Sequence, residues 1–456
     1  MLIAFIARIP DFVAAPYPIG MPDIRPFAGI RYSRRPDLDL SKLIAPPYDV
    51  LDDAQKAALQ SRHANNIVTV DLPFTPPKSV GPDDVYAKAN TTLKAWMSAG
   101  IMVQDRRPAI YPYTQVFDHH GKAFHRRGFI ALVKLSPFGE GHVVPHEKTH
   151  AGPIEDRLKL MHATGMQLSP IFGLFNDNRG EVTRRLYQNL GRPQADATEG
   201  GVRNQLWSVI DSDLENEVIK QMGTKPVFIA DGHHRYTTAL VYQKQIEERS
   251  GGKLPTNHPA NWCMFVLVGM QDDGLLIMPT HRLVGGLSSF NMPAFKDAIA
   301  ADFDVEELPV VPAQLAGVAT SIAAGAPHTF ALYDGKSKST HLLTLKNQDL
   351  LEPLAPDHSQ AWRRLDVAIL QRFLIEEILQ PKFAGGNQLT LGYTADAATI
   401  GQQVDGSKYQ IALLLRPTPL PALEDLGRNN EVMPQKSTYF FPKLATGMVL
   451  NPLKSE

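Results

Sequence analysis

The chain passes from an apolar run to an amphipathic segment through one short polar turn, in the stretch Lys225-Pro-Val-Phe-Ile-Ala-Asp-Gly-His-His-Arg-Tyr-Thr-Thr-Ala-Leu-Val-Tyr242. The run rich in Val, Ile and Phe predicts a strand, and the apolar spacing after the turn predicts a helix. The turn, Asp231 to Arg235, therefore lies at a helix N-terminus. Backbone N–H groups and the positive end of the helix dipole favour an anion there.

Apolar runs of the same kind predict further strands, and apolar residues three and four apart predict helices between them. The predicted strands are 128–135, 170–175, 205–210, 226–230, 262–269, 329–333, 389–393 and 410–415. The predicted helices are 83–99, 155–163, 236–249, 311–324 and 360–379. These elements do not alternate regularly, so the sequence predicts an α+β fold of mixed sheets with peripheral helices.

The 456 residues of the chain exceed the usual size of one domain. Breaks rich in Gly, Pro and polar residues predict a boundary near residue 288, between a core domain 21–288 and a C-terminal α+β domain 289–456. Residues 1–20 are interpreted as an extension outside the fold, because Arg8 and Pro10 interrupt their apolar start and Met21 is a second candidate start.

The composition argues against several classes of function. The 46 Lys and Arg residues are balanced by 47 Asp and Glu residues, so no net positive charge attracts the chain to nucleic acid. No apolar run reaches the roughly 18 to 20 residues that cross a bilayer, which argues against a membrane protein. The single cysteine, Cys263, allows no internal disulfide and fits a reducing, cytoplasmic compartment.

A second polar stretch runs from Pro145 to His150 and matches the pattern HExxH. In a zinc hydrolase, His146 and His150 would bind the metal from one helix and Glu147 would be the general base. Pro145 and the nearby Gly-Pro pair interrupt such a helix. The alternatives are a solvated loop, or an active-site loop in which Glu147 and His150 act in catalysis, supported by Thr149 and His146.

The turn after the strand at 226–230 is interpreted as a phosphate site. Gly232 permits an unusual backbone conformation, and Arg235 offers a planar, doubly donating group to phosphate. His233 and His234 are candidate catalytic groups because imidazole titrates near neutral pH. The alternative is that Asp231 only caps the helix and that its neighbours are exposed polar residues.

Three further short stretches place polar residues beside apolar runs. Asp49 follows two prolines and, like Asp231, is a candidate magnesium ligand, although a turn aspartate often serves only local hydrogen bonds. His281 and Arg282 follow a predicted strand end, where His281 would support the site and Arg282 would bind phosphate. The last stretch offers a cation and two hydroxyl groups for phosphate, or is a surface turn; its residues are Lys436, Ser437 and Thr438.

Six blocks in order resemble the bacterial and archaeal domain-of-unknown-function family numbered one thousand and fifteen, over about residue 23 to the end. The blocks are Pro26-Phe-Ala-Gly-Ile-Arg-Tyr32, Ala45-Pro-Pro-Tyr-Asp-Val50, His146-Glu-Lys-Thr149, Ala230-Asp-Gly-His-His-Arg-Tyr236, Pro279-Thr-His-Arg282 and Pro434-Gln-Lys-Ser-Thr438. The resemblance brings no settled activity.

The turn is also similar to the phosphate-binding box of the ParB and sulfiredoxin superfamily, through Gly232, His234 and Arg235. This resemblance implies a ParB/sulfiredoxin-like subdomain in which Arg235 and the turn amides hold nucleotide or substrate phosphates. The charge balance argues against a partition-type DNA function. Sulfiredoxin chemistry needs a cysteine in the box, and Cys263 lies elsewhere. Of the activities in this superfamily, phosphoryl transfer on small molecules remains, which is the activity of free-serine kinases.

The sequence thus predicts an enzyme acting on a phosphate-bearing small molecule or nucleotide, as a phosphotransferase, including the amino-acid kinase type, or a phosphohydrolase. ATP or ADP and magnesium are the expected cofactors, because phosphoryl transfer depends on placement and charge neutralisation. The alternatives are a zinc-dependent hydrolase and a noncatalytic nucleotide sensor. A scaffolding role accounts least well for clusters so rich in His, Arg and Asp.

Overall fold

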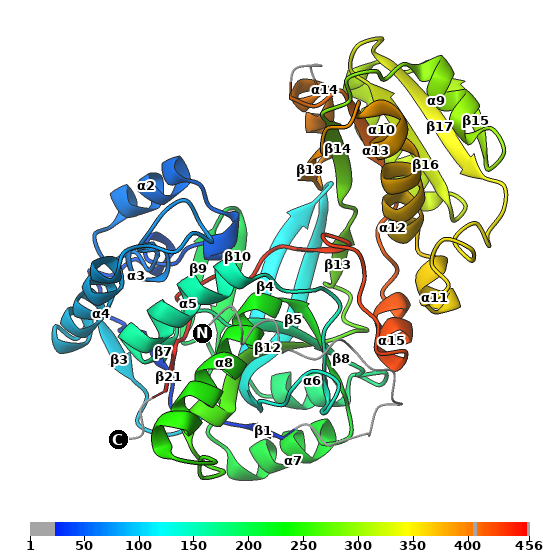
Figure 1. The fold of residues 1–456 in the computed structure, drawn as a ribbon. Coiled ribbons are helices and arrows are strands. Elements are labelled where there is room, and N and C mark those ends of the chain that lie inside the picture. The colour runs from blue at the N-terminus through cyan, green and yellow to red at the C-terminus, as the bar shows by residue number, and fades with distance from the viewer. Residues whose placement is uncertain (1–22, 405–407, 454–456) are drawn as a thin grey trace. The chain divides into compact units, whose positions relative to one another are not determined.

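The computed structural model describes residues 23–404 and 408–453, so the predicted extension 1–20 lies outside the described residues. The chain divides into two compact units (Figure 1). The first unit consists of two segments, the chain up to Leu275 and the chain from Pro442 onward. The second unit is Leu276–Phe441. The second unit begins and ends on one antiparallel strand pair, β13 (Leu276–Met278) with β20 (Tyr439–Phe441). The division therefore falls earlier than residue 288, and the last residues belong to the first unit.

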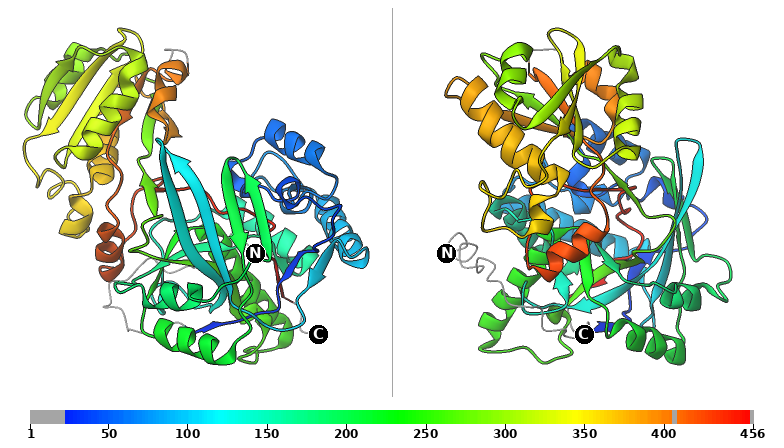
Figure 2. Two further views of the ribbon diagram at one scale, coloured as in Figure 1. Left: turned by 180° about the vertical axis from the view of Figure 1, so that it is seen from behind. Right: turned by 90° about the vertical axis from the view of Figure 1, so that its right-hand side faces the viewer.

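The first unit contains a nine-stranded mixed sheet in the order β6-β11-β8-β12-β5-β4-β10-β9, with β1 added beside β5. Its strands are β1 (Ile24–Arg25), β4 (Tyr111–His119), β5 (Lys122–Lys134), β6 (Val143–Val144), β8 (Ile171–Phe175), β9 (Ala195–Glu199), β10 (Val202–Leu206), β11 (Val227–Asp231) and β12 (Trp262–Gly269). The pairs β11 with β6 and β12 with β8 are parallel, and the other pairs are antiparallel. The strands β4 and β5 form a long hairpin (Figure 2).

Helices and two small strand pairs complete this unit. The pairs are β2 (Ile30–Tyr32) with β3 (Met102–Gln104) and β7 (Met166–Gln167) with β21 (Asn451–Pro452). The helices are α2 (Asp53–Arg62), α3 (Val68–Asp71), α4 (Asp83–Ser98), α5 (Ala151–Thr164), α6 (Glu181–Tyr187), α7 (Ser212–Met222) and α8 (His233–Ser250). The helices α5 and α8 pack together through an apolar cluster that includes Ile154, Leu158 and Val241. This packing brings the segment before α5 to the start of α8.

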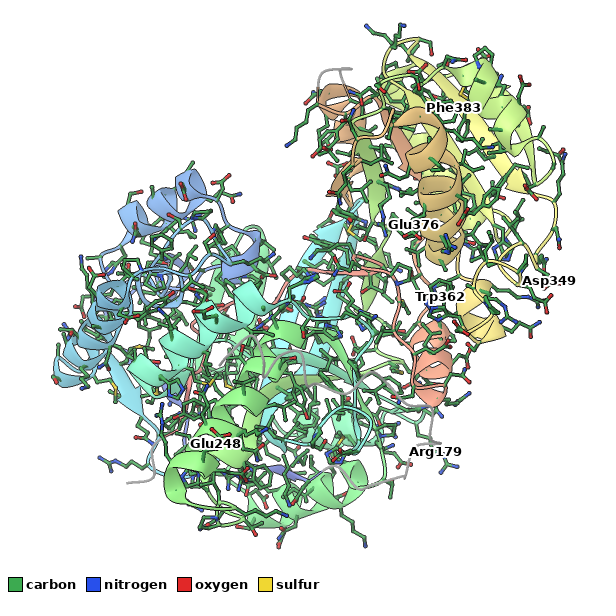
Figure 3. The ribbon with its side chains drawn as sticks, viewed as in Figure 1. Arg179, Glu248, Asp349, Trp362, Glu376 and Phe383 are labelled. Carbon is green, nitrogen blue, oxygen red and sulfur yellow. The ribbon has the colours of Figure 1, made fainter. Side chains whose placement is uncertain are left out.

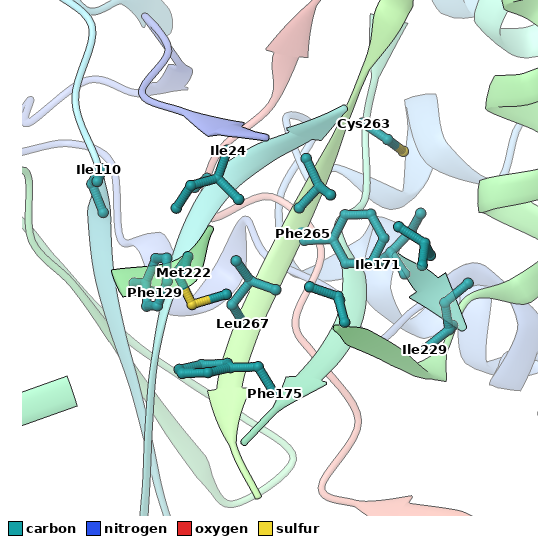
Figure 4. Close-up of a cluster of buried hydrophobic side chains, with 14 of the residues drawn as sticks. Ile24, Ile110, Phe129, Ile171, Phe175, Met222, Ile229, Cys263, Phe265 and Leu267 are labelled. Carbon is teal, nitrogen blue, oxygen red and sulfur yellow. The ribbon is translucent and has the colours of Figure 1, made fainter. Parts of the chain in front are cut away.

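The core of the first unit lies between the sheet and its covering helices (Figure 4). Phe265 and Leu267 of β12 are fully buried, as is Ile229 of β11. Tyr236 of α8 and Met222 of α7 pack into the same cluster. Because burying a large apolar side chain contributes roughly 1.5–3 kcal/mol, this cluster holds β11 and the first turns of α8 in a fixed relation.

The second unit contains a six-stranded sheet in the order β15-β17-β16-β19-β14-β18, in which all pairs are antiparallel. Its strands are β14 (His281–Gly285), β15 (Phe303–Leu308), β16 (Thr329–Asp334), β17 (Ser339–Leu345), β18 (Thr390–Thr394) and β19 (Ile411–Leu414). Its helices are α9 (Met292–Ile299), α10 (Leu315–Ala324), α11 (Gln360–Arg363), α12 (Asp366–Ala368), α13 (Gln380–Phe383), α14 (Ile400–Gln403), α15 (Pro421–Arg428) and a π-helix, Ile369–Leu379. Trp362 of α11 donates a hydrogen bond to the Val432 carbonyl at 3.0 Å, which anchors the segment after α15 (Figure 3).

The predicted α+β class is confirmed, since both units combine sheets with helices. The predicted strands at 226–230 and 262–269 and the predicted helix at 83–99 agree with β11, β12 and α4 within one or two residues. The single helix predicted at 360–379 is wrong, because Leu365 is extended with ψ 130° and separates α11 from the helical turns that follow. Among the described residues, no helix is long and apolar enough to cross a membrane.

Candidate functional site

The turn between β11 and α8 is the centre of the candidate site. Gly232 has φ +99°, in the left-handed region that favours glycine, and it directly precedes the 18-residue helix α8. A Cβ at this position would lie 3.0 Å from Nε of Arg235. Both the backbone conformation and the crowding therefore require glycine here, and the predicted strand, turn and helix all form.

Asp231 is held between two cations in this turn. One carboxylate oxygen lies 3.3 Å from Nζ of Lys443, and the other lies 3.2 Å from a guanidinium nitrogen of Arg235. Burial by itself would raise the pKa of Asp231, but Lys443 and Arg235 outweigh it and hold that pKa below its ordinary value. Asp231 is therefore an anion with two cationic partners. This placement makes it a poor magnesium ligand, contrary to the role predicted for it.

The guanidinium of Arg235 points back into the protein. It donates to the Pro170 carbonyl as well as to Asp231, and its side chain is only 11% exposed. It also lines a partly open cavity of about 40 Å³ together with Tyr48, Asp71 and Arg157. Ligand pockets are roughly 300–1,000 Å³, so this cavity is too small for a nucleotide. Arg235 thus supports the turn, and its predicted role as a direct phosphate ligand remains a prediction.

The two polar stretches recognised in the sequence meet at the start of α8. The backbone N–H of His146 donates to Nε2 of His233, and the backbone N–H of His150 donates to Nε2 of His234, both at 3.1 Å. The ring centroids are 4.5 Å apart in the His146 and His233 pair, and 6.0 Å apart in the other pair. Because Nε2 accepts a hydrogen bond in each case, a neutral His233 or His234 carries its proton on Nδ1.

His146 is buried, and its Nδ1 lies 2.7 Å from the Ile229 carbonyl. Burial lowers the pKa of His146, which favours a neutral ring. The segment from Pro145 to His150 contains no helix, and α5 begins only at Ala151. The helical arrangement that a zinc hydrolase would need is therefore missing from this segment. Within residues 23–404 and 408–453, no group of three His, Cys, Asp or Glu side chains is arranged to hold a metal ion.

Glu147 and Thr149 lie in the same loop, between the two histidines that contact α8. Both residues are half-buried, and Thr237 in α8 donates a hydrogen bond to the Thr149 hydroxyl at 3.5 Å. The loop is thus attached to α8 at several points. The catalytic roles predicted for Glu147, His150, His233 and His234 remain predictions.

Asp49 lies in the first unit, in the short 3-10 helix Tyr48–Val50. Its Oδ2 is 4.0 Å from Nζ of Lys78, while its Oδ1 is buried without a hydrogen-bond partner among the described residues. An unpaired buried carboxylate oxygen is a group that a magnesium ion satisfies. Asp49 therefore fits a magnesium ligand better than Asp231 does.

The remaining predicted residues belong to the second unit. His281 and Arg282 are both fully buried in β14. Burial, with a contribution from Arg282, lowers the pKa of His281 to about 4. Lys436 and Ser437 lie in the loop before β20, together with Thr438. Residues 231–235, 146–150 and Asp49 thus share one unit, and residues 281–282 and 436–438 share the other.

Two features of the first unit were not predicted. The first is Lys443, the partner of Asp231; the only sequence signal was a lysine at the end of the polar stretch that begins at Pro434. The second is a surface cleft of about 560 Å³ beside α6. It is lined by residues including Arg127, Asp177 and Asp272, which carry no pattern in the sequence.

Comparison with known proteins places the chain in a family. The chain belongs to the family described as protein of unknown function (DUF1015), whose sequence profile matches residues 24–368. Five of the six sequence blocks lie within this match, and the sixth, Pro434–Thr438, lies beyond it. Comparison with curated proteins gives no match.

Several solved structures align loosely with the chain. A free serine kinase in complex with AMP is 11% identical, with 66% of this chain and 83% of that chain covered and a TM-score of 0.31. SbnI with a C-terminal truncation, from Staphylococcus aureus, is 12% identical, with 71% and 87% covered and a TM-score of 0.34. A conserved hypothetical protein from Pyrococcus furiosus is 13% identical, with 66% and 89% covered and a TM-score of 0.31. Similarity this loose supports no inference about fold or function.

Proposed function

We propose that this protein is a phosphotransferase or phosphohydrolase that binds a phosphate-bearing small molecule or nucleotide at the start of α8. One observation carries the proposal. Two polar loops more than 80 residues apart in sequence are joined over this helix N-terminus by hydrogen bonds from the backbone of His146 and His150 to His233 and His234. A charged ligand explains this number of polar groups at one helix N-terminus better than packing of the helix does.

The charge at this helix end favours an anion. Lys443 and Arg235 bring two positive charges against the single negative charge of Asp231. The dipole of an 18-residue helix adds about half a positive charge at its N-terminus. The first N–H groups of a helix also have no acceptor within the helix. Phosphate therefore gains charge neutralisation and hydrogen bonds at one place.

Phosphoryl transfer fits this site because it depends on positioning and on charge compensation. In the proposed reaction Glu147 accepts the proton of the attacking hydroxyl or water, whose oxygen bonds to phosphorus as the bond to the leaving oxygen breaks. His233 and His234 position the phosphate, and Lys443 balances its charge. Asp49 would hold a magnesium ion, which supplies further charge neutralisation when bound. In this interpretation Gly232, His234 and Arg235 correspond to the ParB/sulfiredoxin-like box.

The test is binding of ATP, ADP and inorganic phosphate, with and without magnesium, to the full chain by calorimetry and thermal shift. Ligand at about a hundred times its dissociation constant raises the free energy of unfolding by roughly 2.7 kcal/mol. Lys443→Met should weaken binding at least tenfold, because it removes the cation while keeping much of the side-chain volume. Lys253→Met is the matched control, since Lys253 is exposed and lies beyond the far end of α8.

Turnover separates the enzyme from the alternatives. Release or transfer of phosphate from a bound nucleotide that is lost in Glu147→Gln, with binding retained, supports the enzyme. Binding without turnover in any phosphoryl-transfer assay supports the nucleotide sensor. Equal binding by wild type and Lys443→Met contradicts a phosphate site at α8. Stoichiometric zinc that is lost in His146→Ala would support the zinc hydrolase instead.

A further inference from the structure

The first unit contains a surface cleft of about 560 Å³ in addition to the site at α8. Three parts of the chain form it: Arg127 of β5, the segment 177–188, which contains α6, and the residues Gly269–Asp272 at the end of β12. Val182 and Leu186 of α6 are buried in the core cluster, so this wall of the cleft is fixed. Ligand pockets are roughly 300–1,000 Å³. The cleft is therefore large enough for a small molecule.

The two carboxylates that line the cleft are already bound by groups of the protein. Asp177 accepts hydrogen bonds from the backbone N–H of Val182 at 3.3 Å and from the backbone N–H and the hydroxyl of Thr183, at 3.2 and 3.0 Å. Asp272 accepts two backbone N–H groups, at 2.9 and 3.3 Å. Asp177 is only 3% exposed, and the side chain of Asp272 is only 4% exposed. Neither carboxylate is therefore available to a ligand.

The two arginines that line the cleft have more donors than partners, since a guanidinium carries five N–H groups. The side chain of Arg127 is 48% exposed, and its one partner among the described residues is Asp272, 3.5 Å from Nε. Arg184 is exposed as well and donates to the Arg179 carbonyl. No carboxylate in the described part of the chain lies within ion-pair distance of Arg184. The cleft thus presents positive charge and hydrogen-bond donors, while its carboxylates are taken.

Tyr187 of α6 adds an apolar surface to the cleft. Its hydroxyl lies 2.8 Å from the carbonyl oxygens of Tyr113 and Gly128, so the ring is held in place and its polar end is turned to the protein. An aromatic face beside two arginines suits an anion with a carbon skeleton better than it suits an inorganic ion.

We propose that this cleft binds a small organic anion, whose carboxylate or phosphate oxygens accept hydrogen bonds from Arg127 and Arg184 and whose carbon skeleton packs on Tyr187. The planar guanidinium donates two parallel hydrogen bonds to either kind of oxyanion. The inference goes beyond the proposed function, because no residue of the site at α8 lines this cleft.

The experiment follows the Nε–H signals of Arg127 and Arg184 in deuterated, ¹⁵N-labelled full-length protein while phthalate or phenyl phosphate is added at constant ionic strength. Phthalate carries two carboxylates and phenyl phosphate one phosphate, each on an aromatic ring, and benzyl alcohol is the uncharged control. Each signal is identified as the one that is lost in Arg127→Gln or Arg184→Gln. Both signals should shift and saturate with one dissociation constant for at least one of the anions, and the tighter anion identifies the class. Each is added to about 20 mM, which saturates a site with a dissociation constant of about 1 mM.

Single substitutions then measure the contribution of each arginine. Arg127→Gln and Arg184→Gln should each raise the dissociation constant at least tenfold, because each removes a charge and most of the donors. Arg184→Lys keeps the charge without the planar group and should cause a smaller increase. Arg185→Gln is the matched control, because Arg185 is the next residue of α6, donates to Glu217 at 2.8 Å and does not line the cleft. That variant should change the dissociation constant less than twofold.

Several results would overturn the inference. Signals of Arg127 and Arg184 that shift with neither anion, or that shift equally with benzyl alcohol, exclude an anion site in the cleft. An unchanged dissociation constant in Arg127→Gln and Arg184→Gln excludes the arginines as its ligands, and an equal increase in Arg185→Gln shows only a general attraction of anions to the surface. The titration is repeated in Lys443→Met, where the same dissociation constant is expected. Loss of binding there contradicts a site separate from α8.

Discussion

Arg235 follows the strand β11 and Arg282 lies in the strand β14, both in short polar stretches, yet the structure uses them differently. Arg235 shares a carboxylate, Asp231, with Lys443, and it retains an exposed fraction of 11%. Arg282 is fully buried and donates to the carbonyls of Thr280, Gln435 and Lys436. The first arginine therefore belongs to a network of charges around Asp231. The second is a fixed support for a backbone loop, and an arginine in a short motif is not by itself a phosphate ligand.

The largest effect is expected where Arg282 is removed. Arg282→Met removes the donor of one buried and two partly buried carbonyls in the second unit, and the expected loss in the free energy of unfolding is about 3 kcal/mol, since an unsatisfied buried group costs roughly 1–3 kcal/mol. Urea unfolding and hydrogen exchange of β14 measure it. Arg364→Met, which breaks an exposed pair with Asp349, is the control and should cost less than about 1 kcal/mol. Equal losses in the two variants would mean that Arg282 is not a structural support.

The next effect distinguishes the charged network from the fixed one. Asp231→Asn leaves Lys443 and Arg235 facing each other without an anion, and we expect a loss of about 2 kcal/mol at pH 7. The folded-state pKa of Asp231 lies below its ordinary value of 3.8, so its contribution is complete above that value and is lost as the pH falls. Wild type should therefore lose more stability than Asp231→Asn between about pH 5 and pH 2. Parallel pH profiles of the unfolding midpoint would contradict the ion pairs.

A smaller effect tests the turn itself. Gly232→Ala places a side chain at φ +99° and 3.0 Å from Arg235, and it should cost about 1.5 kcal/mol and weaken phosphate binding. Gly251→Ala is the matched control at the other end of α8, where φ is +75° and nothing lies within 4 Å of the added Cβ. That substitution should cost about 1 kcal/mol and leave binding unchanged. Similar binding losses in both variants would show that the effect is a general one on α8.

The smallest effect concerns the loop that Arg282 supports. Lys436→Gly relieves the left-handed conformation but adds freedom to the unfolded chain, so stability should stay within about 0.5 kcal/mol of wild type. Lys436→Val should lose about 1–2 kcal/mol, because a β-branched residue disfavours φ +57°. Thermal unfolding of both variants gives the comparison. A loss in Lys436→Gly as large as in Lys436→Val would show that the loop does not need its left-handed residue.

Much of the fold could be predicted from local sequence. The strand β11, the turn at Gly232 and the helix α8 all follow from apolar spacing and from one glycine, and these signals act over a few residues. The strand β14 was not predicted, and the break at Leu365 was missed, because the backbone there depends on packing with distant elements. Lys443 could not be assigned, because its partner lies more than 200 residues away.

The sequence by itself determined the class of fold, the polar clusters and the helix N-terminus on which the proposed function depends, because apolar periodicity, turn glycines and side-chain chemistry are local properties. Only the tertiary structure decided which clusters meet. It joined His146 and His150 to His233 and His234, and it assigned the predicted residues to two units. It also turned both arginines toward the protein, because a buried guanidinium must find acceptors wherever the fold supplies them.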